Sequence, residues 1–503
     1  MGQRRGLRNE PSPWRGAGRV ARTARFLLYC LILWAPLPLG SNRPVFWAIN
    51  GFVATLILLL FGLGEVFATH RRTFDWRPAA WLAVAMALWA GWMVAQAVPG
   101  VPASLRHPIW SELAAHLPGP IAGTISGSPS ATWTTICQAV PTAFLAFVAM
   151  RLAFHRERGI FLLNLLVATT TAVAGYGLAA QYFGFRQVFL LDSVAYPGFV
   201  TATFVGRNAA AAYFVIGLAA ASALLAGRLQ AKLGRAGAAK SWFMSAAEMV
   251  GGGGIYLVAC LILATAILNS GSRGGTTAGG IALMSVAYLT VRGGATEKRA
   301  VGGMFVVIGA ALFAVVAISG DLLFHRLASG VDTEDRLLVY RDTIDMILAR
   351  PFLGHGAGGF ADIYPLFHRL APGPAVWDHA HDTYLQMAAE LGLPISVLLI
   401  VAVAGVLVVI FREIRGDAPA PAAIAAVGAA VALAVHVLVD FSVQIQAVGL
   451  TLAVLVGAGL GEALRLSRQR SEAPAERPGA AEPSPSPAPR ERVYVTIPTT
   501  AKG

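Results

Sequence analysis

The stretch that decides how this chain is built is Pro351–Leu393, with the sequence PFLGHGAGGFADIYPLFHRLAPGPAVWDHAHDTYLQMAAELGL. It lies among very apolar segments, yet it contains the acid Asp378 and four of the ten histidines of the chain, His355, His368, His379 and His381. Ionisable side chains are costly inside a bilayer and tend to be functional there. We therefore expect this segment to lie at one face of a membrane and to carry the chemistry, with the remaining chain as its scaffold.

Composition places the chain among multi-pass membrane proteins. Of its 503 residues, 56% are hydrophobic and 13% are charged, whereas a soluble domain has about 25% charged residues. A membrane-spanning helix needs roughly 17–25 mostly apolar residues. The sequence predicts an all-α polytopic membrane protein with about 12 transmembrane helices, at residues 26–41, 45–64, 79–98, 134–152, 159–183, 208–227, 252–269, 276–291, 301–319, 387–411, 421–439 and 446–464.

The distribution of basic residues orients these helices. With the N-terminus inside, 29 of the 39 Lys and Arg fall in the segments predicted to be cytoplasmic and 10 in the outer ones. Lys and Arg gather in cytoplasmic loops of membrane proteins, so this alternation supports the order of the spans and places both termini in the cytoplasm. It also explains the net charge of +13 without a nucleic-acid partner.

Three parts of the chain are expected. The basic N-terminus precedes a first apolar run that is broken by prolines and lacks a clear cleavage site, so we interpret that run as a retained helix rather than a signal peptide. The C-terminal tail is rich in Pro, Ala, Ser and Glu and is expected to be disordered. The boundaries are 1–25 for the cytoplasmic N-terminus, 26–464 for the transmembrane domain with a long outer loop at about 320–386, and 465–503 for the tail.

Arginines on the outer side depart from the usual charge distribution of membrane proteins. We therefore ask of each one whether it binds a ligand or has a structural role. Arg273 lies in a short outer turn, Asn269–Gly275, between small residues that leave its guanidinium and the backbone N–H groups open to a ligand. Arginine binds phosphate through a planar fork, and a helix N-terminus favours the same anion. The alternative is an arginine that extends to the lipid headgroups.

Two further outer segments contain candidate anion-binding arginines. Arg336 and Arg341 lie in a segment whose apolar positions 337, 338, 344, 347 and 348 predict an amphipathic helix along the outer surface. The neighbouring acids Asp335, Asp342 and Asp345 offer the alternative of simple ion pairing. Arg207 opens the sixth span and is a third candidate.

Histidines at the end of the opening stretch are candidates for proton transfer. A neutral His379 or His381 beside a hydroxyl would act as a general base or hydrogen-bond donor near pH 7; the alternative is that either one caps the following helix. Two histidines two residues apart cannot share a helix face, which argues against a metal site. His436 and Asp440, four residues apart at the outer end of the eleventh span, would pair with each other or support an arginine.

Several of these segments together resemble the O-antigen ligase/polymerase family. The resemblance covers roughly residues 26–464 and rests on the order and spacing of Ser272–Gly275, Asp335–Arg336, Arg350–Phe360, Ala380–Gly392 and His436 to Phe441. It implies an inner-membrane bacterial glycosyltransferase that uses undecaprenyl-pyrophosphate-linked glycan at the periplasmic face, without a metal or other cofactor. The implied acceptor is lipid A–core, another glycan or a protein.

The resemblance also implies roles for individual residues. Arg273 and Arg336 would grip the donor pyrophosphate, and His381 would orient or deprotonate the acceptor hydroxyl. Asp382 stands where the family has Asn, which leaves the role of that position open. Further substrate contacts would come from Arg207, Arg341, His379 and Tyr384.

Other functions remain as alternatives to a ligase. A repeat-unit or exopolysaccharide polymerase of the same family would use the same donor chemistry. A polysaccharide or lipid transporter would require ionisable residues near mid-membrane at broken helices, whereas here the charges cluster at span ends. A non-catalytic assembly partner is a third possibility. We find no P-loop and no dinucleotide-binding pattern on a predicted strand.

Overall fold

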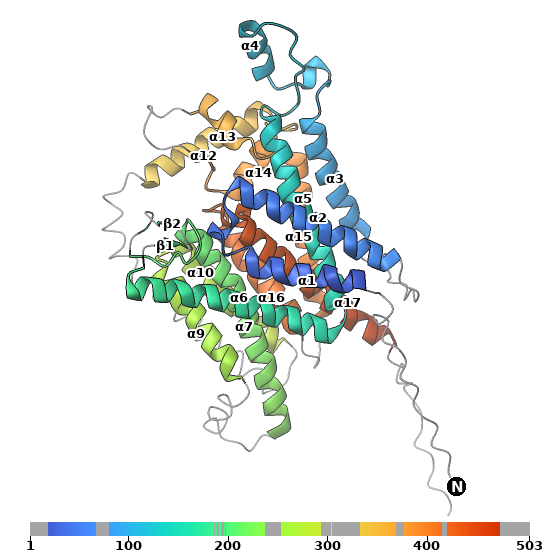
Figure 1. The fold of residues 1–503 in the computed structure, drawn as a ribbon, viewed down its shortest axis with the longest axis vertical. Helices are drawn as coiled ribbons and strands as arrows, with labels where there is room; N and C mark the ends of the chain where they lie inside the picture. Colours follow the sequence, from blue (N-terminus) through green and yellow to red (C-terminus); the bar gives the residue numbers. More distant parts are fainter. Residues whose placement is uncertain are drawn as a thin grey trace, which may run out of the picture.

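The protein is described by a computed structural model that covers residues 19–66, 80–185, 187–188, 191–192, 196, 198–236, 253–292, 303, 332–368, 377–414 and 420–472. The α-helices in these ranges are α1 Arg19–Trp34, α2 Pro44–Val66, α3 Ala80–Ala97, α4 Ile109–His116, α5 Pro129–Ala153, α6 Arg156–Phe183, α7 Arg207–Ala236, α9 Gly254–Asn269, α10 Arg273–Val291, α12 Asp332–Ala349, α13 Phe360–Ile363, α14 Thr383–Leu391, α15 Leu393–Glu413, α16 Pro421–His436 and α17 Gln446–Glu472 (Figure 1). Short 3-10 turns occur at Leu39–Ser41, Ala103–Leu105, Tyr364–Leu366 and Ser442–Gln444.

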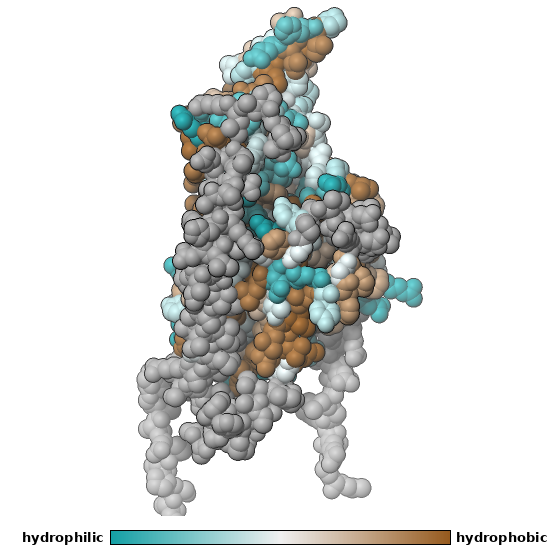
Figure 2. Space-filling model, turned by 90° about the vertical axis from the view of Figure 1, so that its left-hand side faces the viewer, coloured by the Kyte–Doolittle hydropathy of each residue, from teal (hydrophilic) through white to brown (hydrophobic). Residues whose placement is uncertain are grey.

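The prediction of an all-α polytopic membrane protein is confirmed. Within the described residues, 8 helices are long and apolar enough to cross a membrane, and two shorter apolar helices, α9 and α16, accompany them. The minor exception is an antiparallel pair of two-residue strands, β1 Gln187–Val188 and β2 Leu191–Asp192. Figure 2 shows a patch of hydrophobic residues low on one face of the molecule, with hydrophilic residues above it.

One predicted span is divided in two. The sequence predicts a single helix at 387–411, but α14 ends at Leu391 and α15 begins at Leu393. Gly392 between them has φ +80°, a conformation that side chains with a Cβ rarely adopt. Of these two helices, only α15 has the length and hydropathy of a membrane span. We therefore group the nine-residue α14 with the segments before it and not with the spans.

The first and last helices are longer than the predicted spans. Helix α1 begins at Arg19, inside the segment expected to be a basic N-terminus, and α17 continues beyond 464 to Glu472. The predicted span at 301–319 lies outside the described residues, as does much of the predicted outer loop.

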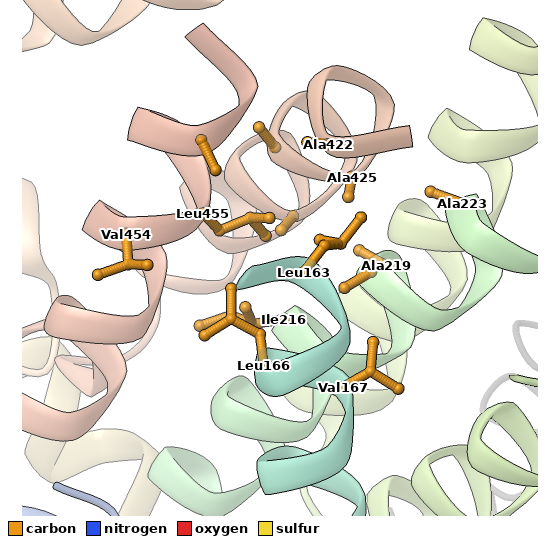
Figure 3. Packing of buried hydrophobic residues seen from close by; sticks show 14 of the residues in the cluster. Leu163, Leu166, Val167, Ile216, Ala219, Ala223, Ala422, Ala425, Val454 and Leu455 are labelled. Atoms are coloured by element: carbon orange, nitrogen blue, oxygen red, sulfur yellow. The ribbon is translucent and has the colours of Figure 1, made fainter. Parts of the chain in front are cut away.

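The centre of the bundle is built from small and branched side chains. The apolar part of helix α7 is completely buried by its neighbours. Side chains from α6, α7, α16 and α17 meet around Leu163, Ile216, Ala425 and Leu455 (Figure 3). Many of the contacts are made by alanine, which allows the helix backbones to approach closely. This packing fixes the positions of the helix ends that carry the candidate site.

Glycines of α17 make the closest helix contact. A Cβ at Gly457 would lie 2.0 Å from the carbonyl oxygen of Ala146 on α5, and one at Gly461 would lie 2.1 Å from that of Met150. Glycines four residues apart form a groove that receives a neighbouring helix backbone. The α5–α17 contact therefore depends on the absence of side chains at both positions.

The candidate site residues lie at one end of the bundle, where α5, α7, α10 and α17 begin and α3, α6 and α16 end; we call this the site end. Helices α12, α13 and α14 and the projecting α4 lie there as well (Figure 1). The glycine-rich run after α12 forms turns against the C-terminus of α14: the backbone N–H groups of His355 and Gly356 donate to the carbonyls of Ala389 and Glu390, both at 2.9 Å.

These turns also need glycine for steric reasons. Gly354 has φ +66°, and a Cβ on it would lie 2.3 Å from the Glu390 carbonyl oxygen. The run is thus a structural clamp that holds α12 and α14 together.

We predict that Gly457→Val lowers the free energy of unfolding by about 1–3 kcal/mol, because overpacking forces the two backbones apart. The measurement is thermal unfolding of the purified protein in detergent. Gly62→Val is the matched control, since a Cβ at Gly62 on α2 meets open space. Equal stability of the two variants would contradict the close α5–α17 contact.

Candidate active site

A buried carboxylate, Asp440, connects the elements of the site end. It lies in the turn that follows α16 and is only 3% exposed. Its Oδ2 accepts a hydrogen bond from Asn208 Nδ2 of α7 at 2.6 Å, and its Oδ1 accepts one from Ser442. The Asp440 carbonyl accepts a bond from Thr383 Oγ1 of α14 at 3.0 Å. One residue thereby joins three segments that are distant in sequence.

His436 brings α10 to the same place. As the last residue of α16, it packs against Gly274, where an added Cβ would lie 2.6 Å from His436 Nδ1. Its Nε2 lies 4.0 Å from Asp440 Oδ1 and 3.3 Å from Ser442 Oγ. The expected His436–Asp440 pairing is thus loose, and the two residues do not share a helix face because α16 ends at His436.

Arg273 is positioned through this contact. It is the first residue of α10, next to Gly274, and the Ser272 side chain caps the helix by accepting a bond from Gly275 N at 3.1 Å. The small residues of this turn allow α10 to start directly beside His436. Arg273 therefore stands at the N-terminus of α10 near the Asp440 turn, where the helix dipole favours an anion.

Arg207 is the residue before Asn208, which donates a hydrogen bond to Asp440. Its guanidinium carbon is 4.9 Å from the ring centroid of Phe199 and 5.5 Å from that of Tyr196. Phe199 in turn covers Gly271, where an added Cβ would lie 2.4 Å from the ring. Since Asn208 binds Asp440, Arg207 is held at the edge of the site with an aromatic ring between it and the turn that bears Arg273.

Helix α12 contributes Arg336 and Tyr340, one helical turn apart and so on the same face. The Tyr340 hydroxyl donates to the His381 carbonyl at 3.2 Å. The Arg336 cation and the Asp440 carboxylate both act electrostatically on Tyr340 and His381. Arg336 and Asp440 thus lie within electrostatic range of His381.

His381 has several features of a functional residue. It adopts φ +54°, which is unusual for a residue with a Cβ, and such backbone strain gathers at functional sites. The rings of Trp377 and Phe441 flank it at 5.5 and 5.0 Å. Its Nδ1 is buried without a hydrogen-bond partner. Burial, and secondarily the Arg336 cation, lowers the pKa of His381 to about 4, so the imidazole is neutral at pH 7.

His379 is held differently. Its ring stacks on Phe441 with centroids 4.0 Å apart, and its Nδ1 lies 3.3 Å from Gln386 Oε1. Gln386 Nε2 donates to Glu390 Oε1 at 3.0 Å, and Gly358 N donates to Glu390 Oε2 at 2.9 Å. Because an amide oxygen only accepts, the Nδ1 of His379 carries the proton. This chain of hydrogen bonds ties the loop before α14 to the glycine-rich clamp.

Asp382, which stands where the resembled family has Asn, caps α14. Its Oδ1 accepts hydrogen bonds from Tyr384 N at 2.8 Å and Leu385 N at 3.0 Å. Asp and Asn are about equally good at this position, so the departure preserves the local structure. The cap is Asp382 rather than either neighbouring histidine, which removes helix capping as an explanation for His379 and His381.

The other two histidines of the opening stretch have structural partners. The backbone N–H of Ile109 donates to His107 Nδ1 at 3.2 Å, His107 Nε2 donates to His355 Nδ1 at 2.8 Å, and His355 Nε2 donates to the Met346 carbonyl at 2.8 Å. This order requires both rings to be neutral. Burial lowers the pKa of His107 to about 3 and that of His355 to about 4.

Helix α12 divides its predicted apolar positions between two faces. Leu337, Ile344 and Leu348 share one face and are 63%, 45% and 69% exposed, as expected for a face that lies along a membrane surface, whereas Ile347 is buried. Asp342 is fully buried, and its Oδ2 accepts a bond from the Tyr364 hydroxyl at 3.2 Å and lies 3.5 Å from His368 Nδ1.

Two predicted substrate contacts lie apart from the Asp440 turn. Arg341 is exposed on α12, turned away from the face that carries Arg336 and Tyr340. The Tyr384 hydroxyl donates to the Ala434 carbonyl of α16 at 2.9 Å and so fixes α14 against α16. Within the described residues, no three His, Cys, Asp or Glu side chains come together as a metal site.

Sequence reasoning did not single out Tyr340, His107 or Gln386. The spacing of four between Arg336 and Tyr340 would have found the tyrosine, because residues at that spacing are neighbours on a helix. His107 lies in a loop with no periodicity, and its partner His355 is 248 positions away, so no local pattern reveals it.

Comparison with known proteins gives one family. Residues 258–400 match the family model described as O-Antigen ligase. The matched segment contains α10, α12 and α14, and so includes Arg273, Arg336 and His381. No curated protein matches the chain.

We predict that His381 titrates near pH 4 instead of near its ordinary value of about 6.5. Replacing the nearby cation in Arg336→Gln removes one cause of the lowered pKa, so the midpoint should rise toward the ordinary value. The measurement is a histidine NMR titration in detergent, with His381→Gln used to assign the signal. A wild-type midpoint near the ordinary value would show that the ring is not buried beside a cation.

Proposed function

We propose that this chain, a multi-pass membrane protein whose residues 258–400 match the O-Antigen ligase family model, transfers glycan from an undecaprenyl-pyrophosphate donor at the periplasmic face of the bacterial inner membrane. The observation that carries the proposal is the meeting of Arg336, His381 and the Asp440 turn, next to Arg273, at the site end. An anion-binding group and a neutral imidazole are what a pyrophosphate-leaving reaction requires.

The donor pyrophosphate is assigned to the arginines. Arg273 begins α10, Arg336 lies on α12, and Arg207 precedes Asn208, which donates to Asp440. Guanidinium groups bind phosphate oxygens in pairs of parallel hydrogen bonds. When the glycosyl bond breaks, negative charge grows on the departing pyrophosphate, and the fixed cations stabilise it without reorganising.

The acceptor hydroxyl is assigned to His381. Its oxygen attacks the anomeric carbon of the donor sugar while the bond from that carbon to the pyrophosphate oxygen breaks. The hydroxyl proton passes to an imidazole nitrogen, and undecaprenyl pyrophosphate leaves. A histidine already neutral at pH 7 can accept this proton, and the imidazolium that forms is stabilised by the carboxylate of Asp440, which acts on it electrostatically.

The remaining network positions these groups. The strained backbone of His381 is held by Tyr340 on one side and by the Asp382 cap on the other. His379 is fixed by stacking on Phe441 and by side-chain hydrogen bonds with Gln386 and Gln444. A displacement of about 1 Å in such groups costs roughly a hundredfold in rate, which is why so many contacts converge on a short loop.

The arrangement of buried charge argues against a transporter. Within the described spans, the buried ionisable groups His436 and Glu462 lie toward opposite ends of the bundle rather than at its middle. His436 is the last residue of α16, and Glu462 binds the first N–H groups of the same helix, at Ala422 and Ala423. Ion-coupled transport would instead place such groups near mid-membrane.

We predict that Arg273→Ala, Arg336→Ala and His381→Ala each reduce glycan transfer by at least about a hundredfold, the effect of losing one charge-stabilising group or the general base. The assay uses purified protein with lipid-linked donor and acceptor in detergent, in the absence of any ion gradient. Arg412→Ala, an exposed arginine at the end of α15, is the control.

Near-normal product from all three variants at normal protein levels would refute the proposed site. Deletion of the gene then separates the acceptor classes. Loss of glycan from lipopolysaccharide indicates a ligase, and loss of long secreted chains indicates a polymerase.

A further inference from the structure

We propose that an exposed aromatic strip at the site end, formed by Tyr182, Phe183, Phe185, Tyr196 and Phe199, is the seat for the first isoprene units of the donor lipid. This inference rests on the proposed function and specifies a part of its substrate site that lies outside the reacting groups. It concerns how the hydrocarbon chain leaves the pyrophosphate and enters the bilayer.

The strip is unusually exposed for aromatic side chains. Tyr182, Phe183 and Phe185 are 83%, 66% and 62% exposed, and Tyr196 and Phe199 are 44% and 42% exposed. The first three rings contact one another, with centroids 5.1 and 5.9 Å apart. At the end of a membrane-spanning helix such exposed aromatic rings are available to hydrocarbon, either of the bilayer or of a bound lipid.

The two halves of the strip are joined. Helix α6 ends at Phe183, and its Gln181 Nε2 donates to the carbonyl of Gly198 at 2.8 Å. Gly198 lies between Tyr196 and Phe199 in sequence. This hydrogen bond therefore places the rings at the end of α6 beside the rings of the following turn.

The strip leads directly to the proposed anion site. The Arg207 guanidinium lies over Phe199 and Tyr196, and Phe199 packs on Gly271, two residues before Arg273. A cation above an aromatic ring keeps its edge N–H groups available for an anion. Moving outward from Arg273, the surface thus changes from cationic to aromatic within one short turn.

This order matches the chemistry of a polyprenyl pyrophosphate. Its anionic group is bonded directly to an isoprene unit, so a protein that binds the pyrophosphate must also accommodate hydrocarbon next to it. Removing each buried methylene group from water contributes about 0.8 kcal/mol, so a few isoprene units on the strip add substantially to donor affinity. The strip lies at the end of the α6 span, where aromatic residues also meet the membrane interface.

The competing role is general contact with bilayer lipid, and donor chain length distinguishes the two. We compare kcat/KM for an undecaprenyl-linked donor and for the same glycan on an ethyl pyrophosphate, which has no isoprene unit to place on the strip. The variant is the double substitution Phe183→Ser with Phe185→Ser. Phe52→Ser on α2 is the matched control, because Phe52 is 71% exposed and lies on a different span.

The expected result is a loss of about tenfold or more in kcat/KM for the undecaprenyl donor, with less than a twofold loss for the ethyl donor. Phe183→Leu with Phe185→Leu should recover most of the long-chain activity, because leucine keeps the apolar surface. The Phe52→Ser control should leave the ratio of the two donors unchanged.

Other outcomes overturn the inference. An unchanged donor ratio in the serine variant assigns the strip to bilayer contact alone, and an equal loss with both donors assigns it to folding or catalysis. Turnover of the undecaprenyl donor by the wild-type protein shows that the proposed function stands even if the strip has no part in it. Absence of turnover with either donor would contradict both the proposed function and the role of the strip.

Discussion

The site depends on the burial of one carboxylate. Asp440 is almost completely removed from water, and a buried charge is stable only when it is hydrogen-bonded or paired. Its oxygens take Asn208 and Ser442 as partners, and its carbonyl takes Thr383. The requirement to satisfy this residue therefore forces α7, α14 and the turn after α16 into one place, and the candidate arginines and His381 follow from where those elements begin.

The scaffold makes this possible because its helices pack at very short distances. Gly457 and Gly461 let α17 lie against the backbone of α5, and Gly274 lets α10 lie against His436. Gly354 and Gly392 do the same for the clamp between α12 and α14. Such backbone contacts fix the relative positions of the helices more closely than contacts between flexible side chains do. Proton transfer and charge stabilisation both require reacting groups at well-defined distances.

Much of the membrane domain could be predicted from the sequence because hydropathy and loop charge are local signals. The divided helix at Gly392 was missed, because the apolar residues on both sides of it outweigh Glu390 and the Gly392 and Pro394 break signals when hydropathy is averaged over a span. The burial of Asp342 on α12 could not be predicted either, because its partner Tyr364 lies on another segment. The inner face of a peripheral helix follows the polarity of what it packs against, which its own sequence does not contain.

The histidines show the same limit for the candidate site. All four in Pro351–Leu393 look equivalent by composition, yet His355 belongs to a hydrogen-bonded pair with His107 and His368 to Asp342. His379 and His381 remain the candidate site histidines, because their rings contact Phe441 next to Asp440. Family resemblance selected His381 from these four; the residues alone did not, since the partners that separate them come from other parts of the chain.

The most direct measurement is a cryo-EM structure of the protein with undecaprenyl pyrophosphate bound. The account predicts pyrophosphate density within hydrogen-bonding distance of both Arg273 and Arg336, with the His381 ring on the side where the sugar would be attached. Density at the opposite end of the bundle, or at the site end but beyond the reach of these two guanidinium groups, would contradict it.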